Sequence, residues 1–185
     1  MNLYLRLLWL LLRVWRLSQH GRRGLLDESR ATFRVLPNDC DLNFHMNNGR
    51  YLSFMDLGRV HLMAQTGLLP VIVKQGWMPV LTAAEINFIR SIMPLQTFDL
   101  VTRLVSWDDK YFYIEQKFEA RGVLCAHAYV KGLFLRKGVR ITNSEIVATA
   151  GYTDTPPPMP EELRLWAELG SAKRSEERRV GKECA

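Results

Sequence analysis

The sequence contains little cysteine and no cysteine pair with the spacing of a metal or redox motif. Its three cysteines, Cys40, Cys125 and Cys184, leave an odd count, so a disulfide framework is not indicated and reduced surroundings are the simpler interpretation. Zinc held by Cys40, His45, Cys125 and His127 is an alternative, but structural zinc usually has tighter paired spacings. We therefore expect no metal.

Several motifs that mark large enzyme classes are also missing. The chain has no G-x-S-x-G, no G-x-G-x-x-G, no G-x4-G-K-[ST] and no H-E-x-x-H. These absences remove the serine hydrolases, nucleotide-fingerprint enzymes and zinc peptidases that such motifs mark. We expect no cofactor.

Positive charge is scarce in the body of the chain, although the net charge is +6. Residues 1–35 carry seven arginines against two acidic residues, whereas residues 36–170 carry thirteen basic against fourteen acidic residues. The basicity belongs to the N-terminal arm and the tail, which argues against nucleic acid as a partner. A length of 185 residues with 48% apolar residues predicts one folded domain with a core.

The N-terminal arm, residues 1–20, lacks the long apolar run of a simple membrane span, since its longest run is Leu7–Leu12. At 100° per residue its polar side chains share one arc, which predicts an amphipathic helix that contacts a membrane surface through residues 1–17. Packing on the domain or on a partner subunit, and a true span or signal anchor, are the alternatives. We expect the protein to be peripheral at the cytoplasmic face of a membrane, or cytoplasmic. The polar residues of that arc are Asn2, Arg6, Arg13, Arg16 and His20.

Residues 28–150 have the pattern of one α+β domain. A first strand over 31–36 precedes a helix over 49–66, which Asn47 or Asn48 caps and which buries a stripe of four residues. Four strands follow, which we expect to form an antiparallel meander that covers the helix. The stripe consists of Tyr51, Met55, Gly58 and Leu62, and the strands span 78–92, 97–107, 110–120 and 123–136.

The C-terminal part has little apolar content. Residues 151–170 predict a proline-rich linker followed by a short helix over 161–169. Residues 171–185 predict a disordered tail, and since nothing in them connects to the fold, they suggest a segment that is not native to this gene product.

Polar side chains concentrate just before the long helix. Unpaired N–H groups at the start of a helix carry positive charge and can stabilise the oxyanion of a carbonyl under attack. A nearby carboxylate, Asp41 or Asp39, can activate water or attack directly, whereas flanking carboxylates make Cys40 a poor nucleophile. The simpler alternative is that Asp39, Asn47 and Asn48 are ordinary loop and cap residues.

The segment Asp41-Leu-Asn-Phe-His-Met-Asn-Asn-Gly-Arg-Tyr51 resembles the signature D-x-N-G-H-x-N-N-x-x-Y of the hotdog-fold acyl-CoA thioesterases of the 4-hydroxybenzoyl-CoA thioesterase type. The run HMNN-x-RYL and the apolar N-terminal segment are most similar to the thioesterase superfamily member 6-like branch. This resemblance implies an antiparallel sheet wrapped around one long central helix, in a homodimer or tetramer with active sites at the subunit interface.

The resemblance also implies roles for individual residues. Asp41 would be the general base or nucleophile, His45 the loop histidine of the catalytic site, and Asn47, Asn48 and Tyr51 the substrate-binding residues at the helix start. The groove between sheet and helix would take the acyl chain of an acyl-CoA or acyl-carrier substrate. Phe44 stands where the family usually has glycine, so its ring could narrow or reshape the substrate pocket.

Two other functions remain open. A membrane-tethered protein of the same fold could bind acyl groups or act as a scaffold without turnover. An enoyl-CoA hydratase or dehydratase is the enzyme alternative, although its motif G-D-x-N-P-x-H differs from this chain at Cys40, at Phe44 and in the spacing from Asp41 to His45.

Overall fold

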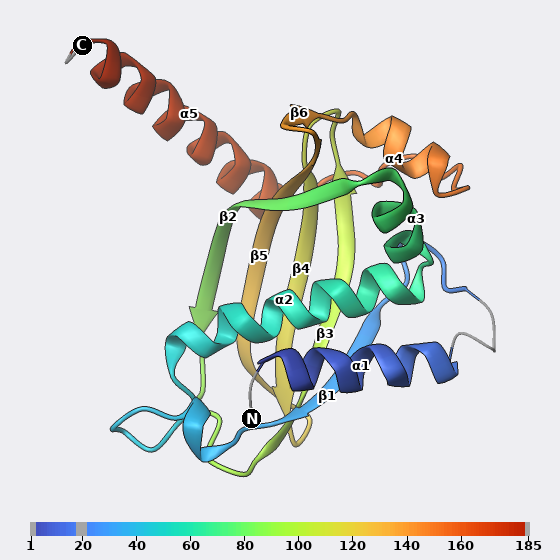
Figure 1. The fold of residues 1–185 in the computed structure, drawn as a ribbon. Helices are drawn as coiled ribbons and strands as arrows, with labels where there is room; N and C mark the ends of the chain where they lie inside the picture. The colour runs from blue at the N-terminus through green and yellow to red at the C-terminus, as the bar shows by residue number, and fades with distance from the viewer. Residues whose placement is uncertain (1–2, 18–21, 184–185) are drawn as a thin grey trace.

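The computed structural model describes residues 3–17 and 22–183. One six-stranded antiparallel sheet curls around the long helix α2, Asn48–Gln65, as Figure 1 shows. This arrangement confirms the predicted α+β hotdog architecture. The strands are β1 (Ser29–Arg34), β2 (Trp77–Phe88), β3 (Thr97–Trp107), β4 (Phe112–Ala120), β5 (Val123–Arg136) and β6 (Val139–Arg140).

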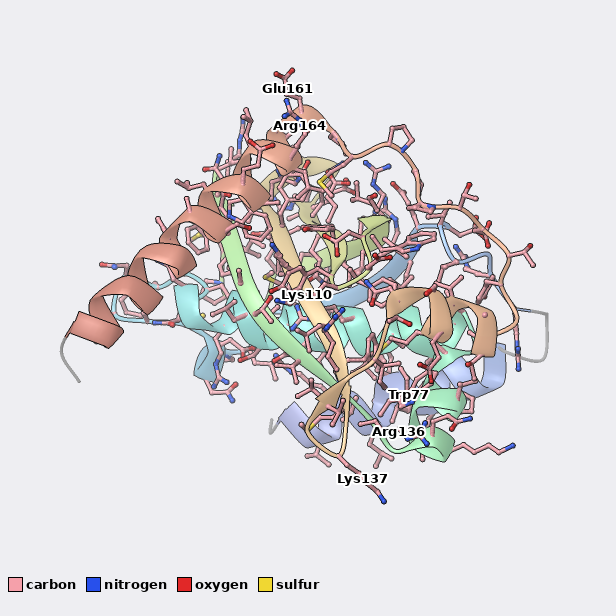
Figure 2. All side chains as sticks on the ribbon, turned by 90° about the horizontal axis from the view of Figure 1, so that it is seen from above. Trp77, Lys110, Arg136, Lys137, Glu161 and Arg164 are labelled. Atoms are coloured by element: carbon pink, nitrogen blue, oxygen red, sulfur yellow. The ribbon has the colours of Figure 1, made fainter. Side chains whose placement is uncertain are left out.

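The strand order corrects the predicted four-strand meander. The sheet runs β1-β3-β4-β5-β2, so only β3, β4 and β5 form a meander, and β2 pairs with β5 instead of β3. Trp77 and Arg136, which lie side by side in Figure 2, begin this pairing. The reason lies in residues 89–96, which make no hairpin: Leu95 N–H donates to the Val35 carbonyl, and Val35 N–H donates to the Gln96 carbonyl. The connection therefore crosses from the β2 edge to the segment after β1.

Helix α2 begins and ends within one residue of its prediction. Asn47 is its N-cap, and the buried stripe contains Tyr51, Met55, Gly58 and Leu62, as predicted. A Cβ atom added to Gly58 would lie 2.6 Å from Leu100 Cδ2 and 2.7 Å from Thr102 Oγ1. The absence of a side chain at this position lets the middle of α2 approach the sheet closely.

Aromatic rings fill the space between α2 and the sheet. Phe54 of α2 packs edge-on against Phe98 of β3, with ring centroids 5.1 Å apart, and Phe98 packs against Phe118 of β4. Both of the other rings in this group, Phe33 and Tyr51, are buried as well. Burial of such large apolar side chains is the main source of the stability of a fold of this kind.

Two short helices are absent from the sequence prediction. They are α3 (Leu68–Gln75), which buries Leu68 and Ile72, and α4 (Asn143–Thr149), which Thr142 caps through a hydrogen bond from Glu145 N–H. The sequence of α3 contains Pro70 and three β-branched residues in Val71-Ile-Val73, which have low helix propensity. Tertiary packing decides its conformation.

Helix α1 (Leu3–Leu17) lies alongside α2, as Figure 1 shows. Leu10 is buried in the main core, and Arg6, one of the residues of the predicted polar arc, is buried too, as in the alternative of packing on the domain. The opposite face exposes Leu5, Leu8, Trp9 and Leu12. The arm therefore packs on its own domain and still has an uncovered apolar stripe. Of the predicted polar residues of the arm, Asn2 and His20 lie outside the described residues, as do the side chains of Arg13 and Arg16.

Helix α5 (Glu161–Glu183) corrects the predicted short helix and disordered tail, because it continues fourteen residues beyond Leu169. Glutamate, lysine, arginine and alanine are good helix formers, and Arg164 and Glu168 form an ion pair one turn apart. Leu163 is fully buried against the outer face of the sheet, and α5 then projects from the body (Figures 1 and 2). In the described ranges, no helix has the length and apolarity needed to cross a bilayer.

Candidate active site

The polar segment before α2 folds into a tight hairpin loop. It follows the short 3-10 helix η2 (Pro37–Asp39). Cys40 and Met46 form an antiparallel bridge, and Asp41 N–H donates to the His45 carbonyl at 3.1 Å. Met46 is buried, and its N–H donates to the Ile92 carbonyl. The hairpin therefore holds residues 41 and 45 opposite each other on a rigid base.

Asp41 and His45, the two predicted catalytic residues, are brought together by this hairpin. His45 Nδ1 lies 3.7 Å from Asp41 Oδ1, and the two side chains are 30% and 24% exposed. Asp41 Oδ1 accepts a hydrogen bond from Asn43 N–H at 2.9 Å, which orients the carboxylate. Asp41 Oδ2 accepts no hydrogen bond within the described ranges, so it is free to accept a proton from water or to contact a substrate.

Some backbone N–H groups at the start of α2 already donate hydrogen bonds within the chain, and one does not. Gly49 N–H donates to the Asn47 side chain at 2.9 Å, and Arg50 N–H donates to the Asn47 carbonyl. Asn48 N–H has no acceptor in the part of the chain that the structure describes. Asn47 therefore acts as the helix cap, and the Asn48 amide is the first-turn donor that remains for an oxyanion.

Asp39, the other candidate carboxylate, is fully engaged in structure. Its side chain is 2% exposed and accepts two hydrogen bonds from Arg6 of α1 and one from Leu36 N–H. A carboxylate so enclosed has no access to water, which leaves Asp41 as the accessible acid of the loop. The sequence did not indicate this role, because Arg6 lies 33 residues earlier in an apolar helix.

Phe44 occupies the turn of the hairpin with a φ of 56°, in the left-handed region that favours glycine. This conformation explains why the motif has glycine at this position. The ring is 75% exposed and points away from the body of its own chain. The sequence left open that this ring narrows the substrate pocket, but the ring does not lie in the pocket between α2 and the sheet.

Tyr51, predicted to bind substrate, lies in the core. Its ring packs edge-on against Phe88 at 4.9 Å and against Phe118 at 4.8 Å, and the side chain is 2% exposed. Burial, together with the nearby Cys125, raises the pKa of Tyr51 to about 12. The phenol stays protonated at neutral pH, and the ring supports the first turn of α2 from below.

Cys40 and Cys125, the two cysteines among the described residues, carry no sign of nucleophilic or metal chemistry. Partial burial, and next the charges of Asp39 and Asp41, raise the pKa of the Cys40 thiol, as the flanking carboxylates predict. His127 of the alternative zinc set instead contacts Glu115 at 2.8 Å. Among the described residues, no group of three or more His, Cys, Asp or Glu side chains is arranged to hold a metal ion.

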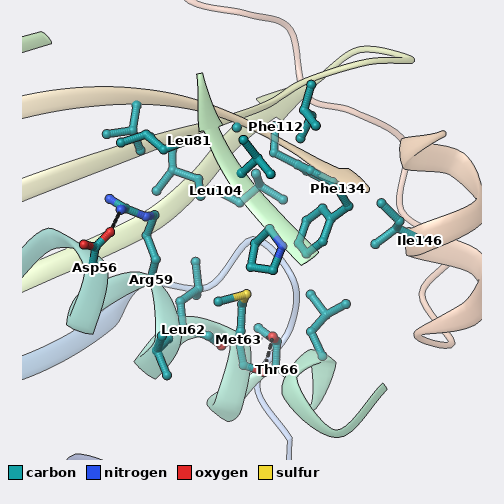
Figure 3. Close-up of a pocket in the computed structure, with 18 of the residues that line it drawn as sticks. Asp56, Arg59, Leu62, Met63, Thr66, Leu81, Leu104, Phe112, Phe134 and Ile146 are labelled. Carbon is teal, nitrogen blue, oxygen red and sulfur yellow. Dashed lines mark hydrogen bonds and ion pairs between the residues drawn. The ribbon is translucent and has the colours of Figure 1, made fainter. Parts of the chain in front are cut away.

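A second feature, an apolar pocket of about 310 Å³, lies between α2 and the sheet. Figure 3 shows it beside the second half of α2, with Leu62 and Met63 on one side and Leu104, Phe112 and Phe134 on the other. Asp56 and Arg59 form an ion pair at its rim, and Arg59 also donates to Gln116 Oε1 at 2.9 Å. The pocket is therefore apolar inside and charged at one edge.

The pocket lies well away from the hairpin loop. Asp56, the first residue of α2 that lines the pocket, follows the N-cap Asn47 by nine residues, which corresponds to about 14 Å along an α-helix. Phe54 and Trp77 are buried, whereas Phe88 and Ile89 are about half exposed. Sequence periodicity marks α2 as buried but gives no sign of an unfilled space beneath it.

Comparisons with known proteins agree with this geometry. The chain is 36% identical to Protein THEM6 of Drosophila melanogaster over 135 residues, 70% of this chain and 67% of that protein. It is 41% identical to Protein THEM6 of Xenopus laevis over 98 residues, 53% of this chain but only 47% of the relative. It is also 28% identical over 99 residues, 51% of this chain and 43% of the relative, to a probable thioesterase of Saccharomyces cerevisiae. The chain thus spans between about half and two thirds of the length of these curated relatives.

Solved structures share the fold. A probable thioesterase from Bartonella henselae superposes with a TM-score of 0.58 at 22% identity, covering 63% of this chain and 98% of that one. A Staphylococcus aureus protein, SAV2348, solved in complex with CoA, superposes with a TM-score of 0.57 at 16% identity, covering 77% of this chain and 96% of that one.

The curled sheet, the single central helix and the acid-bearing loop before it define a hotdog-fold protein of the thioesterase type. A family model described as the Thioesterase-like superfamily matches residues 35–167. This chain belongs to that superfamily.

Proposed function

We propose that this protein hydrolyses acyl thioesters, with acyl-CoA or an acyl carrier as substrate and Asp41 as the general base or nucleophile. The observation that carries the proposal is the position of the Asp41 carboxylate, which is accessible, oriented by Asn43 N–H and adjacent to His45 at the amino end of α2. Membership of the Thioesterase-like superfamily and the curated relatives named as thioesterases support the same activity.

In the general-base route, Asp41 takes a proton from water while the water oxygen bonds to the thioester carbonyl carbon. The carbonyl oxygen becomes an oxyanion, which the Asn48 N–H and the positive end of α2 stabilise. Collapse of this intermediate breaks the C–S bond, and the proton held by the loop passes to the departing thiolate. The products are a free acid and a thiol. In the nucleophilic route the Asp41 oxygen attacks the carbonyl carbon, the C–S bond breaks and the thiolate leaves and takes up a proton. Water then cleaves the resulting mixed anhydride, which releases the free acid and restores the Asp41 carboxylate.

The apolar pocket under α2 provides the site for the far end of an acyl chain. Because the pocket begins about 14 Å along α2 from the helix cap, only an extended chain would reach it from a thioester held at Asp41. The charged pair Asp56–Arg59 marks its solvent side. CoA as the carrier is supported by the neighbouring structure solved with CoA.

A second copy of the chain is the proposed partner. Strand β2 is at the edge of the sheet, and its backbone groups on that side are available for pairing with another strand. Met78, Leu81 and Phe88 of this strand are 43–55% exposed. A homodimer, or a tetramer built from it, would cover both features and bring a second chain next to the loop.

A membrane surface is the proposed partner of α1. Leu5, Leu8, Trp9 and Leu12, spaced by three and four residues, form one exposed apolar stripe. A stripe of this kind inserts into the headgroup region of a bilayer. The protein would then be peripheral at the cytoplasmic face.

The test is release of free thiol from a panel of acyl-CoA substrates of increasing chain length. Asp41→Asn is the diagnostic variant, and Asp154→Asn, an exposed carboxylate in the linker, is the matched control. If the parent protein binds acyl-CoA but releases no thiol at any length, the proposal is wrong. The protein would then be an acyl-binding member of the fold.

A further inference from the structure

Arg6 of α1 is buried between two parts of the candidate site. Its guanidinium donates to Asp39 Oδ1 at 3.2 Å and to Asp39 Oδ2 at 2.5 Å, and the two side chains are 6% and 2% exposed. The guanidinium carbon lies 4.7 Å from the centre of the Phe54 ring on α2. Arg6 therefore contacts both η2, which precedes the catalytic loop, and α2, which follows it.

Asp39 connects Arg6 to the start of α2 through further hydrogen bonds. Its side chain also accepts from Leu36 N–H at 2.9 Å, and its carbonyl accepts from Asn47 N–H at 2.9 Å. Asn47 is the helix cap and directly precedes the Asn48 amide, while Asp41 lies two residues after Asp39. One bonded path thus links the arm to both proposed catalytic groups.

Removal of Arg6 would leave a buried carboxylate without a counter-charge. Arg50 Nε, at 3.6 Å from Asp39 Oδ1, is the other cation nearby, but it is beyond hydrogen-bonding distance and its side chain is 40% exposed. An uncompensated buried charge is strongly unfavourable, so the 36–40 segment would shift until water reaches Asp39. That movement would displace Asn47 and Asp41.

We infer that Arg6 is a positioning residue for the Asp41 loop, so that docking of α1 on α2 sets the catalytic geometry. This inference rests on the proposed thioesterase activity. The exposed stripe of α1 lies on the face opposite Arg6 and Leu10, so a surface can bind the arm without releasing Arg6. The arm is in this sense a part of the site and not only a tether.

The test compares Arg6→Met, which keeps an apolar stem without the charge, with Arg6→Lys, and uses Arg30→Met as the matched arginine control. Arg30 lies on β1, where it forms ion pairs at the surface of the sheet with Asp99 and Glu119. We expect Arg6→Met to lower kcat by about 10²-fold with little change in KM, because a displacement of about 1 Å has an effect of that size and the acyl pocket is untouched. Arg6→Lys should recover part of kcat, and Arg30→Met should match the parent.

Hydrogen exchange gives a second measurement that needs no turnover. The Asn47 amide should exchange faster in Arg6→Met, while core amides of β4 such as that of Phe118 keep the parent rate. The double variant Arg6→Met/Asp39→Asn, which removes both charges, should restore slow exchange at Asn47. Unchanged exchange at Asn47 in a folded Arg6→Met protein overturns the inference, as does a loss of kcat that only follows the unfolded fraction. If the parent has no activity but Asn47 exchange responds as expected, the proposed function fails and the positioning role of Arg6 stands.

Discussion

Filling the pocket under α2 should change the substrate range without changing the chemistry. Val60 lines the pocket from α2 about 20 Å along the helix from the Asn47 cap. Val60→Phe places a ring in a space of about 310 Å³ that is otherwise available to an acyl chain. The variant should therefore exclude the last methylene groups of a long chain while short chains, which end before the pocket, remain unaffected.

The magnitude follows from the burial of each methylene. Burial of one CH2 group contributes about 0.8 kcal/mol. Displacement of two methylenes would cost about 1.6 kcal/mol, which corresponds to about 15-fold in kcat/KM for long substrates. For the short substrates we expect a change below about 2-fold.

The assay is kcat/KM for thiol release over a series of acyl-CoA lengths, with Val60→Ile as the conservative control at the same position. In the parent, kcat/KM should rise once the acyl chain is long enough to enter the pocket. For Val60→Phe, kcat/KM should fall below the parent value only for chains longer than that. A uniform decrease at all lengths, or a loss confined to short chains, would show that the acyl chain does not enter this pocket.

Three further predictions address packing, charge and the arm. Gly58→Ala should lower the free energy of unfolding by up to about 2 kcal/mol, since overpacking against Leu100 and Thr102 costs about 1–3 kcal/mol and helix propensity returns about 1; a thermal midpoint above that of the parent would contradict it. Burial alone would raise the pKa of Glu115, but hydrogen bonds from His127, Arg103 and Lys117 outweigh it and hold the pKa below the ordinary value. The ionised Glu115 therefore contributes to the free energy of unfolding above about pH 4.3, and this contribution is lost as the pH falls through the folded-state pKa. In acid unfolding, Glu115→Gln should lack this pH-dependent loss of stability. Leu8→Ser and Trp9→Ser should each lower the affinity for anionic vesicles about 10-fold in a sedimentation assay, whereas the control Val73→Ser should bind as the parent does. Equal binding by all three variants would refute membrane contact through the exposed stripe of α1.

Local patterns in the sequence predicted most of the elements. The ends of β3 and β5 coincide with their predictions, because alternating apolar residues and the turn chemistry of Trp107-Asp-Asp-Lys110 and Ala120-Arg-Gly122 define them. Helix α2 was equally clear from its 3.6-residue stripe and its asparagine cap. Such signals involve neighbours in sequence.

These local signals did not predict which strands pair over long distances in the sequence. The partner of β2 is decided by the crossing of residues 89–96 under α2, where Met46 N–H binds the Ile92 carbonyl and Leu95 N–H binds the Val35 carbonyl. Helix α3 forms where Leu68 and Ile72 are buried, against the local preference of its β-branched residues. Both outcomes depend on tertiary contacts.

The candidate site divides in the same way. The motif identified Asp41, His45 and Asn47, and the structure brings them to one loop and one helix cap. Arg6 looked like a solvated residue of an amphipathic arm, because an arginine in an apolar helix normally faces water. Its buried partner Asp39 is 33 residues away, and only the fold reveals the pair.

The central claim is that the Asp41 carboxylate at the amino end of α2 drives thioester cleavage. The most direct measurement is kcat for acyl-CoA hydrolysis by Asp41→Asn, with circular dichroism to establish that the variant is folded and Asp154→Asn measured in parallel. We predict a loss of about 10²–10⁴-fold in kcat for Asp41→Asn and parent-like turnover for Asp154→Asn. Hydrolysis by folded Asp41→Asn at the rate of the parent would contradict the account.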